Sequence, residues 1–346
     1  MEIRDYLHLL CESQGPSGFE KGVAEIAKEA IKPFVDTVEI DVLGNLIATK
    51  KCKKKNAKKM LIAAHLDEIG LIVTGHEDGF LCFGQIGGVD QRMLPGRDLI
   101  IMTPTPMLGV VCAMPPHVLK PEDMEKAIPM DQLRIDVGLS QKEAEKKIPI
   151  GTPITFRTEG FNLGEDLYVS KTLDDRACFA ALIRAAELLK GKRLPWDVVF
   201  VGSTCEETGG KGAAVANFKE APVVCAAIDV THGKTPDMQE DAQGFELGSG
   251  PSLSIGPNIS KIVGDQMIKL AKEKEIPYNI EVQSGRTGTD AWAMQITREG
   301  VATGLIGLPL KYMHTPVETV SIKDIEYCAR LVAEYAQNPG LEVLSC

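Results

Sequence analysis

The chain has 346 residues, of which 44% are hydrophobic and 25% are charged, the balance of an ordinary folded protein in water. This length predicts about two domains. A formal net charge of -10 excludes a nucleic-acid partner, because binding to phosphates requires a basic face. The one lysine-rich run, residues 50–59, is interpreted as a solvated hairpin turn.

The N-terminus and the cysteine pattern predict the compartment. The first 15 residues carry acidic side chains where a secretory signal would be basic. No stretch approaches the roughly 20 apolar residues that cross a bilayer, so we expect no membrane partner. Nine cysteines are scattered between Cys11 and Cys346 without a Cys-x-x-Cys pair, which argues against a disulfide framework and a zinc ribbon. We therefore expect a cytoplasmic protein.

The first 69 residues show the pattern of an α/β domain. Apolar spacing and turn residues predict, in chain order, a helix at 3–11, a turn at 15–18, a helix at 19–31, a hairpin of strands 37–42 and 46–49, and a strand at 60–65. The last strand is continuously apolar, which is typical of a strand that is buried on both faces of a sheet.

Residues 70–164 have a different texture. They are crowded with Gly and Pro and contain short strand-like pieces, such as 70–74, 99–102 and 109–112, and only 141–147 looks clearly helical. This pattern predicts a small β-barrel or sandwich. From about residue 166 apolar strands alternate with helices again. We expect one α/β domain, formed by residues 1–69 and 165–346, with a β-rich domain inserted at 70–164.

Acidic and imidazole side chains follow five predicted strands of the α/β domain. They are His65, Asp67 and Glu68 after the strand at 60–64, Asp174 and Asp175 after 167–169, Glu206 and Glu207 after 196–203, Asp229 after 223–228, and His314 and Glu318 after 301–306. In open α/β sheets, ligands bind at the carboxyl edge of the strands. We expect these side chains to meet there.

A single acid at a strand end most often caps a turn or helix. Five such clusters on one edge instead require a compensating cation. Imidazole and carboxylate ligands without cysteine favour zinc, cobalt or manganese, and their number favours a two-metal hydrolytic site. The remaining histidines are expected to be structural or exposed: His8, His76, His117 and His232.

The order and spacing of these motifs carry a family resemblance. The motifs are SQGPSGFE at 13–20, AHLDEIG at 64–70, LDDR at 173–176, EETG at 206–209, DVTH at 229–232, GTDA at 288–291 and YMHTPVE at 312–318. Together they resemble the M42 family of metallo-aminopeptidases, also called tetrahedral aminopeptidases, some of whose members have been labelled cellulase M. The match covers nearly the whole chain. Lys311 departs from the Arg that many relatives carry there.

The resemblance implies a fold and a site. The fold is a mixed α/β sheet with helices on both faces, interrupted by a β-barrel-like domain that mediates dimerisation. Two divalent metals, Zn²⁺ or Co²⁺ with Mn²⁺ as a further candidate, share Asp174; His65 and Asp229 complete one site, and Glu207 and His314 the other. Glu206 is the implied general base, and Asp67 orients the His65 imidazole. The peptide bond between Asp174 and Asp175 is expected to be cis.

The implied function is removal of N-terminal residues from oligopeptides by dimers that assemble into a dodecamer. We expect neutral aliphatic residues, leucine foremost, to be preferred over acidic ones, because the segments that flank the presumed site are mostly small or apolar. The ligands alone leave a related carboxypeptidase or deacylase open. A glycosidase would need two metal-free carboxylates, and a solute-binding or structural protein would use its acids only as caps.

Overall fold

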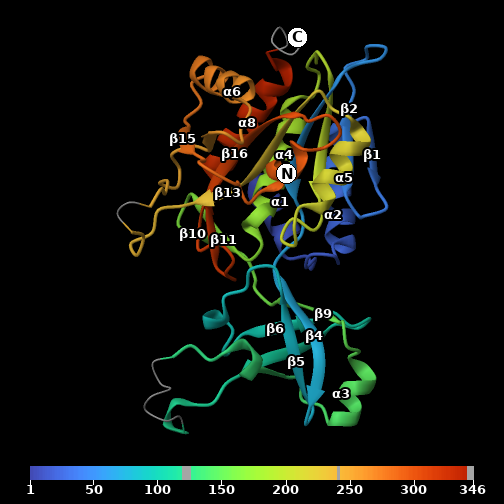
Figure 1. The fold of residues 1–346 in the computed structure, drawn as a ribbon, viewed down its shortest axis with the longest axis vertical. Coiled ribbons are helices and arrows are strands. Elements are labelled where there is room, and N and C mark those ends of the chain that lie inside the picture. The colour runs from blue at the N-terminus through green and yellow to red at the C-terminus, as the bar shows by residue number, and fades with distance from the viewer. Residues whose placement is uncertain (119–125, 240–241, 341–346) are drawn as a thin grey trace.

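The computed structural model describes residues 1–118, 126–239 and 242–340. It consists of an α/β part, formed by both ends of the chain, and a closed β-barrel formed by the middle (Figure 1). The predicted fold class is confirmed. In the described residues no helix is both long enough and apolar enough to cross a membrane.

One large mixed sheet forms the centre of the α/β part. Its strands, in spatial order, are β1 (Thr37–Ile40), β2 (Leu46–Lys50), β12 (Asp197–Ser203), β3 (Lys59–His65), β13 (Val224–His232), β16 (Ala302–Lys311), β17 (Glu318–Ser321), β11 (Leu167–Ser170) and β10 (Phe161–Leu163). Off this path, β14 (Ser252–Ile255) pairs with β16 and with β15 (Asn279–Val282).

The strand directions explain why polar side chains gather at one edge. β12, β3, β13 and β16 are parallel to one another. β17 is antiparallel to both β16 and β11, so β11 points the same way as the other four. All five strands therefore end at the same edge, as the sequence predicts.

Helices cover both faces of this sheet, and the alternation of side chains along each strand divides the core. Met60 and Ile62 face α1 (Ile3–Cys11), α2 (Lys21–Ile31), α4 (Leu173–Leu188), α6 (Lys261–Glu273) and α8 (Ile322–Gln337). Leu61 and Ala63 face α5 (Lys211–Glu220) and α7 (Asp290–Met294).

The barrel closes in the order β4 (Gly70–Glu77), β5 (Phe80–Ile86), β8 (Arg134–Asp136), β7 (Met107–Cys112), β6 (Asp98–Ile101) and β9 (Pro153–Phe156). It has its own apolar core, against which α3 (Gln141–Lys147) packs through Ala144. Figure 1 shows the barrel as a separate body that joins the α/β part near the carboxyl ends of its strands.

Two predicted strands are too short. β13 continues to His232 rather than ending at 228, and β16 continues to Lys311 rather than ending at 306. The two strands pair with each other along this whole extension, down to His232 and Leu310. Backbone pairing thus overrides the polar residues that suggested an end. Asp229 lies inside β13 and not after it.

Candidate metal centre

Strand register brings the first side chains together. β3 pairs with β12 as far as His65 and Ser203, and with β13 as far as Ala63 and Ala227. His65 and Asp229 each lie two residues beyond that last pair, so the register places them side by side on neighbouring strands. Both continue the alternating positions that face α5 and α7, so their side chains leave the sheet on the same side.

The next element supplies the carboxylate at the centre. α4 begins at Leu173, and the Asp174–Asp175 peptide bond is cis, as the resemblance implies. Asp174 Oδ1 lies 3.1 Å from His65 Nε2, and Asp174 Oδ2 lies 3.3 Å from His314 Nε2. The same His314 nitrogen is 3.2 Å from Glu207 Oε1. Asp174 therefore stands between two imidazoles.

The other nitrogen of each imidazole has a fixed partner. His65 Nδ1 lies 3.1 Å from the Asp67 carbonyl oxygen and 3.5 Å from Asp67 Oδ1. His314 Nδ1 lies 3.0 Å from the carbonyl oxygen of Gly88, which follows β5 of the barrel. With Nδ1 donating, each Nε2 faces carboxylates and can bind a cation in place of its own proton, as metal-binding histidines do.

Asp67 has a second task. Its Oδ1 accepts the backbone N–H of Glu206 at 3.0 Å, and its Oδ2 accepts that of Glu207 at 3.1 Å. These two hydrogen bonds connect the turn after β12 to the end of β3. They are shielded from water because Asp67 is fully buried. The sequence predicts the contact with His65 but not the contact with the turn.

Burial raises the pKa values of several acids of the cluster. It raises the pKa of Glu206 to about 8, and it also raises the pKa values of Asp229 and Glu318. Burial alone would also raise the pKa of Asp174, but hydrogen bonds from His314 and His65 hold it below its usual range. Without positive charge nearby, these carboxyls cannot all ionise.

The donor set fits divalent cations. Donor atoms of His65, Asp174 and Glu207 lie within 4.8 Å of one another, and so do those of His65, Asp175 and Asp229. Asp175 Oδ1 has no hydrogen-bond partner among the described residues, although the side chain is fully buried. A cation would satisfy this oxygen. Asp175 follows Asp174 in the sequence, but nothing in the sequence predicts that its carboxylate lies close to that of Asp229.

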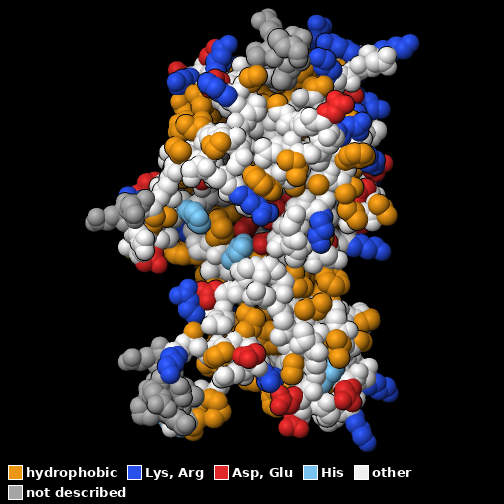
Figure 2. All heavy atoms as spheres, viewed as in Figure 1, with side chains coloured by type: hydrophobic (Ala, Val, Ile, Leu, Met, Phe, Trp, Pro, Cys, Tyr) orange, Lys and Arg blue, Asp and Glu red, His pale blue; other side chains and the backbone are white. Residues whose placement is uncertain are grey.

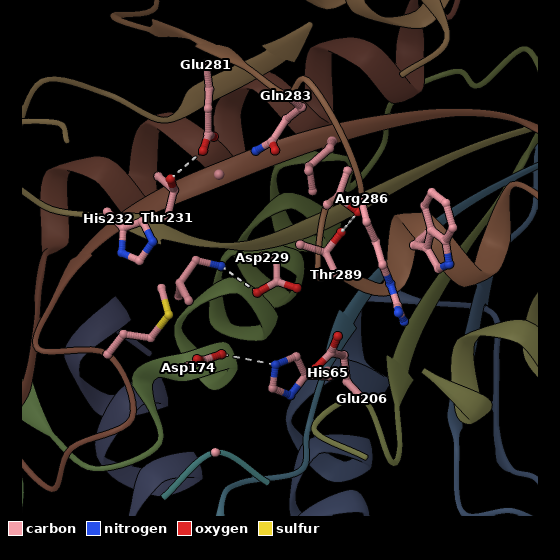
Figure 3. A pocket seen from close by; sticks show the side chains of 18 of the residues that line it. His65, Asp174, Glu206, Asp229, Thr231, His232, Glu281, Gln283, Arg286 and Thr289 are labelled. Atoms are coloured by element: carbon pink, nitrogen blue, oxygen red, sulfur yellow. Dashed lines mark hydrogen bonds and ion pairs between the residues drawn. The ribbon is translucent and has the colours of Figure 1, made fainter. Parts of the chain in front are cut away.

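The cluster forms the floor of a cleft of about 820 Å³. Figure 2 shows this hollow above the barrel, with histidine and acidic side chains in it. In Figure 3 the side chains of His65, Asp174, Glu206 and Asp229 converge on one space. His232 is exposed, as expected, and it also lines the wall of the cleft. It lies at the end of the extended β13.

Of the other three histidines, none lines the cleft. His8 lies 3.8 Å from Glu12 on α1, and His76 Nε2 lies 2.8 Å from the carbonyl oxygen of Ile148 in the barrel. His117 is exposed. Glu281, Gln283 and Arg286 do line the cleft, and the sequence offers no pattern that singles out Glu281.

A buried imidazole and carboxylate cluster of this kind, at the carboxyl edge of an α/β sheet, defines a metal-dependent hydrolase. A family model described as M42 glutamyl aminopeptidase matches residues 44–331. The chain belongs to the M42 family of aminopeptidases, and it is a peptide hydrolase. This confirms the resemblance and decides against the glycosidase and the non-catalytic alternatives.

Individual relatives are similar to this chain along nearly their whole length. The chain is 38% identical to a lysyl aminopeptidase of Pyrococcus furiosus over 93% of both chains. Its structure is similar to that of an aminopeptidase from Desulfurococcus kamchatkensis, with a TM-score of 0.91, 34% identity and coverage of 99% and 97%. It is also similar to the TET1 peptidase of Pyrococcus horikoshii, with a TM-score of 0.85, 31% identity and coverage of 97% and 99%.

Proposed function

We propose that the enzyme removes N-terminal residues from oligopeptides with two metal ions and with Glu206 as the general base. The observation that carries this proposal is the position of Asp174, whose two carboxylate oxygens face the Nε2 atoms of two different histidines. A carboxylate so placed suits a bridge between two cations. The aminopeptidase activity of the family supplies the reaction.

The proposed ligands divide into two sets. His65 and Asp229 would hold one ion, Glu207 and His314 would hold the other, and Asp174 would contribute to both. The mixture of imidazole and carboxylate suits Zn²⁺ or Co²⁺, with Mn²⁺ as a further candidate. When bound, the ions would lower the pKa of a water and polarise the scissile carbonyl.

Glu206 then moves the proton. Its carboxylate accepts a proton from the attacking water and returns it to the nitrogen of the leaving peptide. Burial raises the pKa of Glu206 above the usual range of a carboxyl group, which suits a side chain that must take up a proton and release it again. Glu207 is the adjacent residue and contacts His314, which supports its proposed role as a ligand.

Glu206→Gln tests this role. The amide keeps the size of the side chain and removes the base, so kcat should fall at least about 100-fold while the metal content stays the same. The matched control is Glu220→Gln, which replaces a largely buried acid that pairs with Lys59 outside the cleft. Near wild-type turnover of a metal-replete Glu206→Gln variant would remove Glu206 from the mechanism.

The cleft supports a preference for neutral aliphatic N-terminal residues over acidic ones. Its wall includes Met238, Leu305 and Met313. The carboxylate of Glu281, fixed by hydroxyl hydrogen bonds from Thr231 and Ser252, repels an acidic side chain.

Arg286 is the cation that could reverse this preference. Of the three cations near the site in sequence, Lys261, Arg286 and Lys311, it is the one that lines the cleft. Its guanidinium lies 5.5 Å from the centre of the Trp292 ring, which is a competing contact.

Anilide substrates measure the preference. We expect kcat/KM for the leucyl anilide to exceed that for the glutamyl anilide by at least about tenfold. A higher value for the glutamyl substrate would contradict the proposal, and Arg286→Met would then identify the responsible cation. The lysyl anilide is the third arm, because Glu281 offers a negative charge to a lysine side chain and a relative carries that activity in its name.

We also propose that the barrel mediates dimerisation, that dimers assemble into a dodecamer, and that the enzyme acts in the cytoplasm. The relative from Pyrococcus horikoshii can form a tetrahedron or a large octahedral shell. Four of the eight described cysteines are buried free thiols, which suits a reducing compartment.

A further inference from the structure

The turn that carries Glu206 and Glu207 is held by two different buried carboxylates. Asp67 accepts the N–H groups of Glu206 and Glu207. The preceding N–H group, that of Cys205, donates to Glu20 Oε1 at 3.0 Å. Three consecutive amides are thus fixed by side chains from outside the turn.

The conformation of Cys205 makes the third contact important. Its φ is 56°, in the left-handed region. This conformation costs a residue with a Cβ atom about 1–2 kcal/mol of conformational energy. The hydrogen bond from its N–H to Glu20 is formed in this conformation and helps to stabilise it. Cys205 immediately precedes Glu206, so its φ and ψ angles set the direction in which the Glu206 side chain leaves the backbone.

Glu20 is built into the structure rather than placed on the surface. It is 4% exposed and stands just before α2, and its Oε1 also accepts the N–H of Gly18 at 2.7 Å. Burial of a carboxylate is costly unless its oxygens are hydrogen-bonded. Here the same oxygen is satisfied by the amides of Gly18 and Cys205.

The segment that presents Glu20 is itself anchored. The N–H of Gly15 donates to Glu68 Oε1 at 2.8 Å, and that of Ser17 donates to the Glu68 carbonyl oxygen at 3.0 Å. Glu68 in turn contacts Lys171 at 2.7 Å. A Cβ atom at Gly15 would lie 2.7 Å from a methyl carbon of Val23, so the segment is tightly packed.

A second tie joins the same two segments. Ser17 Oγ and Thr208 Oγ1 lie 2.8 Å apart. Glu20 therefore forms a hydrogen bond with the beginning of the turn at Cys205, and Ser17 forms one with its end at Thr208. The N-terminal segment 15–20 acts as a brace for the turn.

We propose that Glu20 is a positioning residue for catalysis, which holds the Cys205 amide so that the Glu206 carboxylate faces the cluster of ligands. This proposal rests on the proposed role of Glu206. Glu20 does not line the cleft, and its hydrogen bonds go to Gly18 and Cys205 rather than to a proposed ligand. Its loss should therefore lower kcat and leave KM and metal content unchanged.

The experiment compares three substitutions of Glu20 by kcat and KM for the leucyl anilide. Glu20→Ala removes the acceptor and Glu20→Asp withdraws it, so each should lower kcat about 10- to 100-fold. Glu20→Gln keeps an amide oxygen that can accept from Cys205, so it should restore kcat to within about threefold of wild type. Metal content by elemental analysis should be unchanged in all three variants.

The matched control is Asp324→Ala. Asp324 is also fully buried and accepts two backbone amides, those of Gly248 and Gly250, but it braces a different turn. It should lower the melting temperature and leave kcat unchanged. If Glu20→Ala does not fold, the contrast between Glu20→Asp and Glu20→Gln decides alone.

Three results would overturn the role of Glu20: wild-type kcat in Glu20→Ala or Glu20→Asp, a Glu20→Gln variant as slow as Glu20→Asp, or a loss of kcat that follows a loss of metal. Failure of the proposed function looks different. Normal turnover of a metal-replete Glu206→Gln variant would contradict the role of Glu206 as the general base. An inactive Glu206→Gln variant together with a fully active Glu20→Ala variant would contradict only the positioning role of Glu20.

Discussion

His314 depends on a residue of the inserted barrel. The Gly88 carbonyl oxygen accepts its Nδ1–H, and a Cβ atom at Gly88 would lie 2.9 Å from that same nitrogen. The adjacent Gly87 has a φ of 72°, and a Cβ atom there would lie 3.1 Å from Glu207 Oε2. The chain can approach the proposed ligands this closely because both residues lack a side chain.

Gly88→Ala should therefore weaken metal binding. The added methyl group would displace the His314 imidazole and its hydrogen bond, and loss of such a supporting contact typically costs about 10- to 100-fold in metal affinity. Titration of the metal-free enzyme with Zn²⁺ or Co²⁺ measures the change. The control is Gly84→Ala on β5, where a Cβ atom would meet its nearest neighbour at 3.5 Å, an ordinary contact. Equal affinity in both variants would contradict this reading.

Residue types and their place after strands were enough to predict which side chains meet. His65, Asp174, Glu207 and His314 lie together as expected, and Asp229 lies level with His65. Contacts that depend on loop geometry were beyond the sequence. Nothing in the string around Gly88 signals that its carbonyl oxygen faces His314, and nothing near Glu20 signals Cys205.

At the scale of elements, a buried ion cluster joins β3, β11 and α4. Glu68, just after β3, contacts Lys171 at 2.7 Å and Arg176 at 3.4 Å, and none of the three is more than 3% exposed. Burial would raise the pKa of Glu68, but the charges of Lys171 and Arg176 lower it below its usual range. The cluster stands behind Asp174 and supports the N-terminal segment.

The sign of this shift gives a pH dependence. Since the pKa of Glu68 is lower in the folded state, its charge stabilises the fold above the unfolded pKa of about 4.3, and this contribution is lost as the pH falls through the folded pKa. Glu68→Gln should lower the free energy of unfolding at pH 7 by about 3 kcal/mol. The difference from wild type should shrink at acid pH.

Urea unfolding of the metal-free proteins at pH 7 and at acid pH checks this prediction. Glu220→Gln is the control, because Glu220 pairs with Lys59 in a more exposed salt bridge, which contributes about 0–1 kcal/mol. A penalty for Glu68→Gln that stays constant with pH would show that the charge of Glu68 is not the source of its stabilisation.

Element boundaries show where local patterns stop being informative. The helices Ile3–Cys11 and Gln141–Lys147 match their predicted bounds, because their apolar spacing and capping residues are local signals. β13 and β16 exceed their predicted ends since each is extended by pairing with the other. The barrel closes through strands as short as Arg134–Asp136, which no local pattern distinguishes from a loop.

At the scale of the molecule, the barrel presents apolar side chains to solvent. Along β7 the side chains of Leu108 and Val110 point outward and are 59% and 44% exposed, and Met114 beyond the strand is 61% exposed. Apolar residues grouped on one side of a domain are typical of a surface that is covered in an assembly. This supports the proposed dimerisation through the barrel.

Light scattering tests the assembly. The native particle should be several times larger than the 37.5 kDa chain. Leu108→Glu should reduce the particle size, because it places a charge on the proposed contact surface. Val42→Glu, at a 96% exposed position in the turn between β1 and β2, should not. A stable wild-type monomer at micromolar concentration would contradict both the dodecamer and the role of the barrel.

The place of the barrel in the chain has a consequence for folding. β3 is continuously apolar and is made before the barrel, yet its two neighbours in the sheet, β12 and β13, are made after it. The barrel strands pair among themselves, over shorter separations along the chain. Contacts between segments that are far apart in the sequence form slowly, so the barrel should fold first. Both edges of β3 stay unpaired during this time. Until residue 232 has been synthesised, the apolar strand that ends in His65 lacks both of its neighbours, which exposes its edges to pairing with other chains.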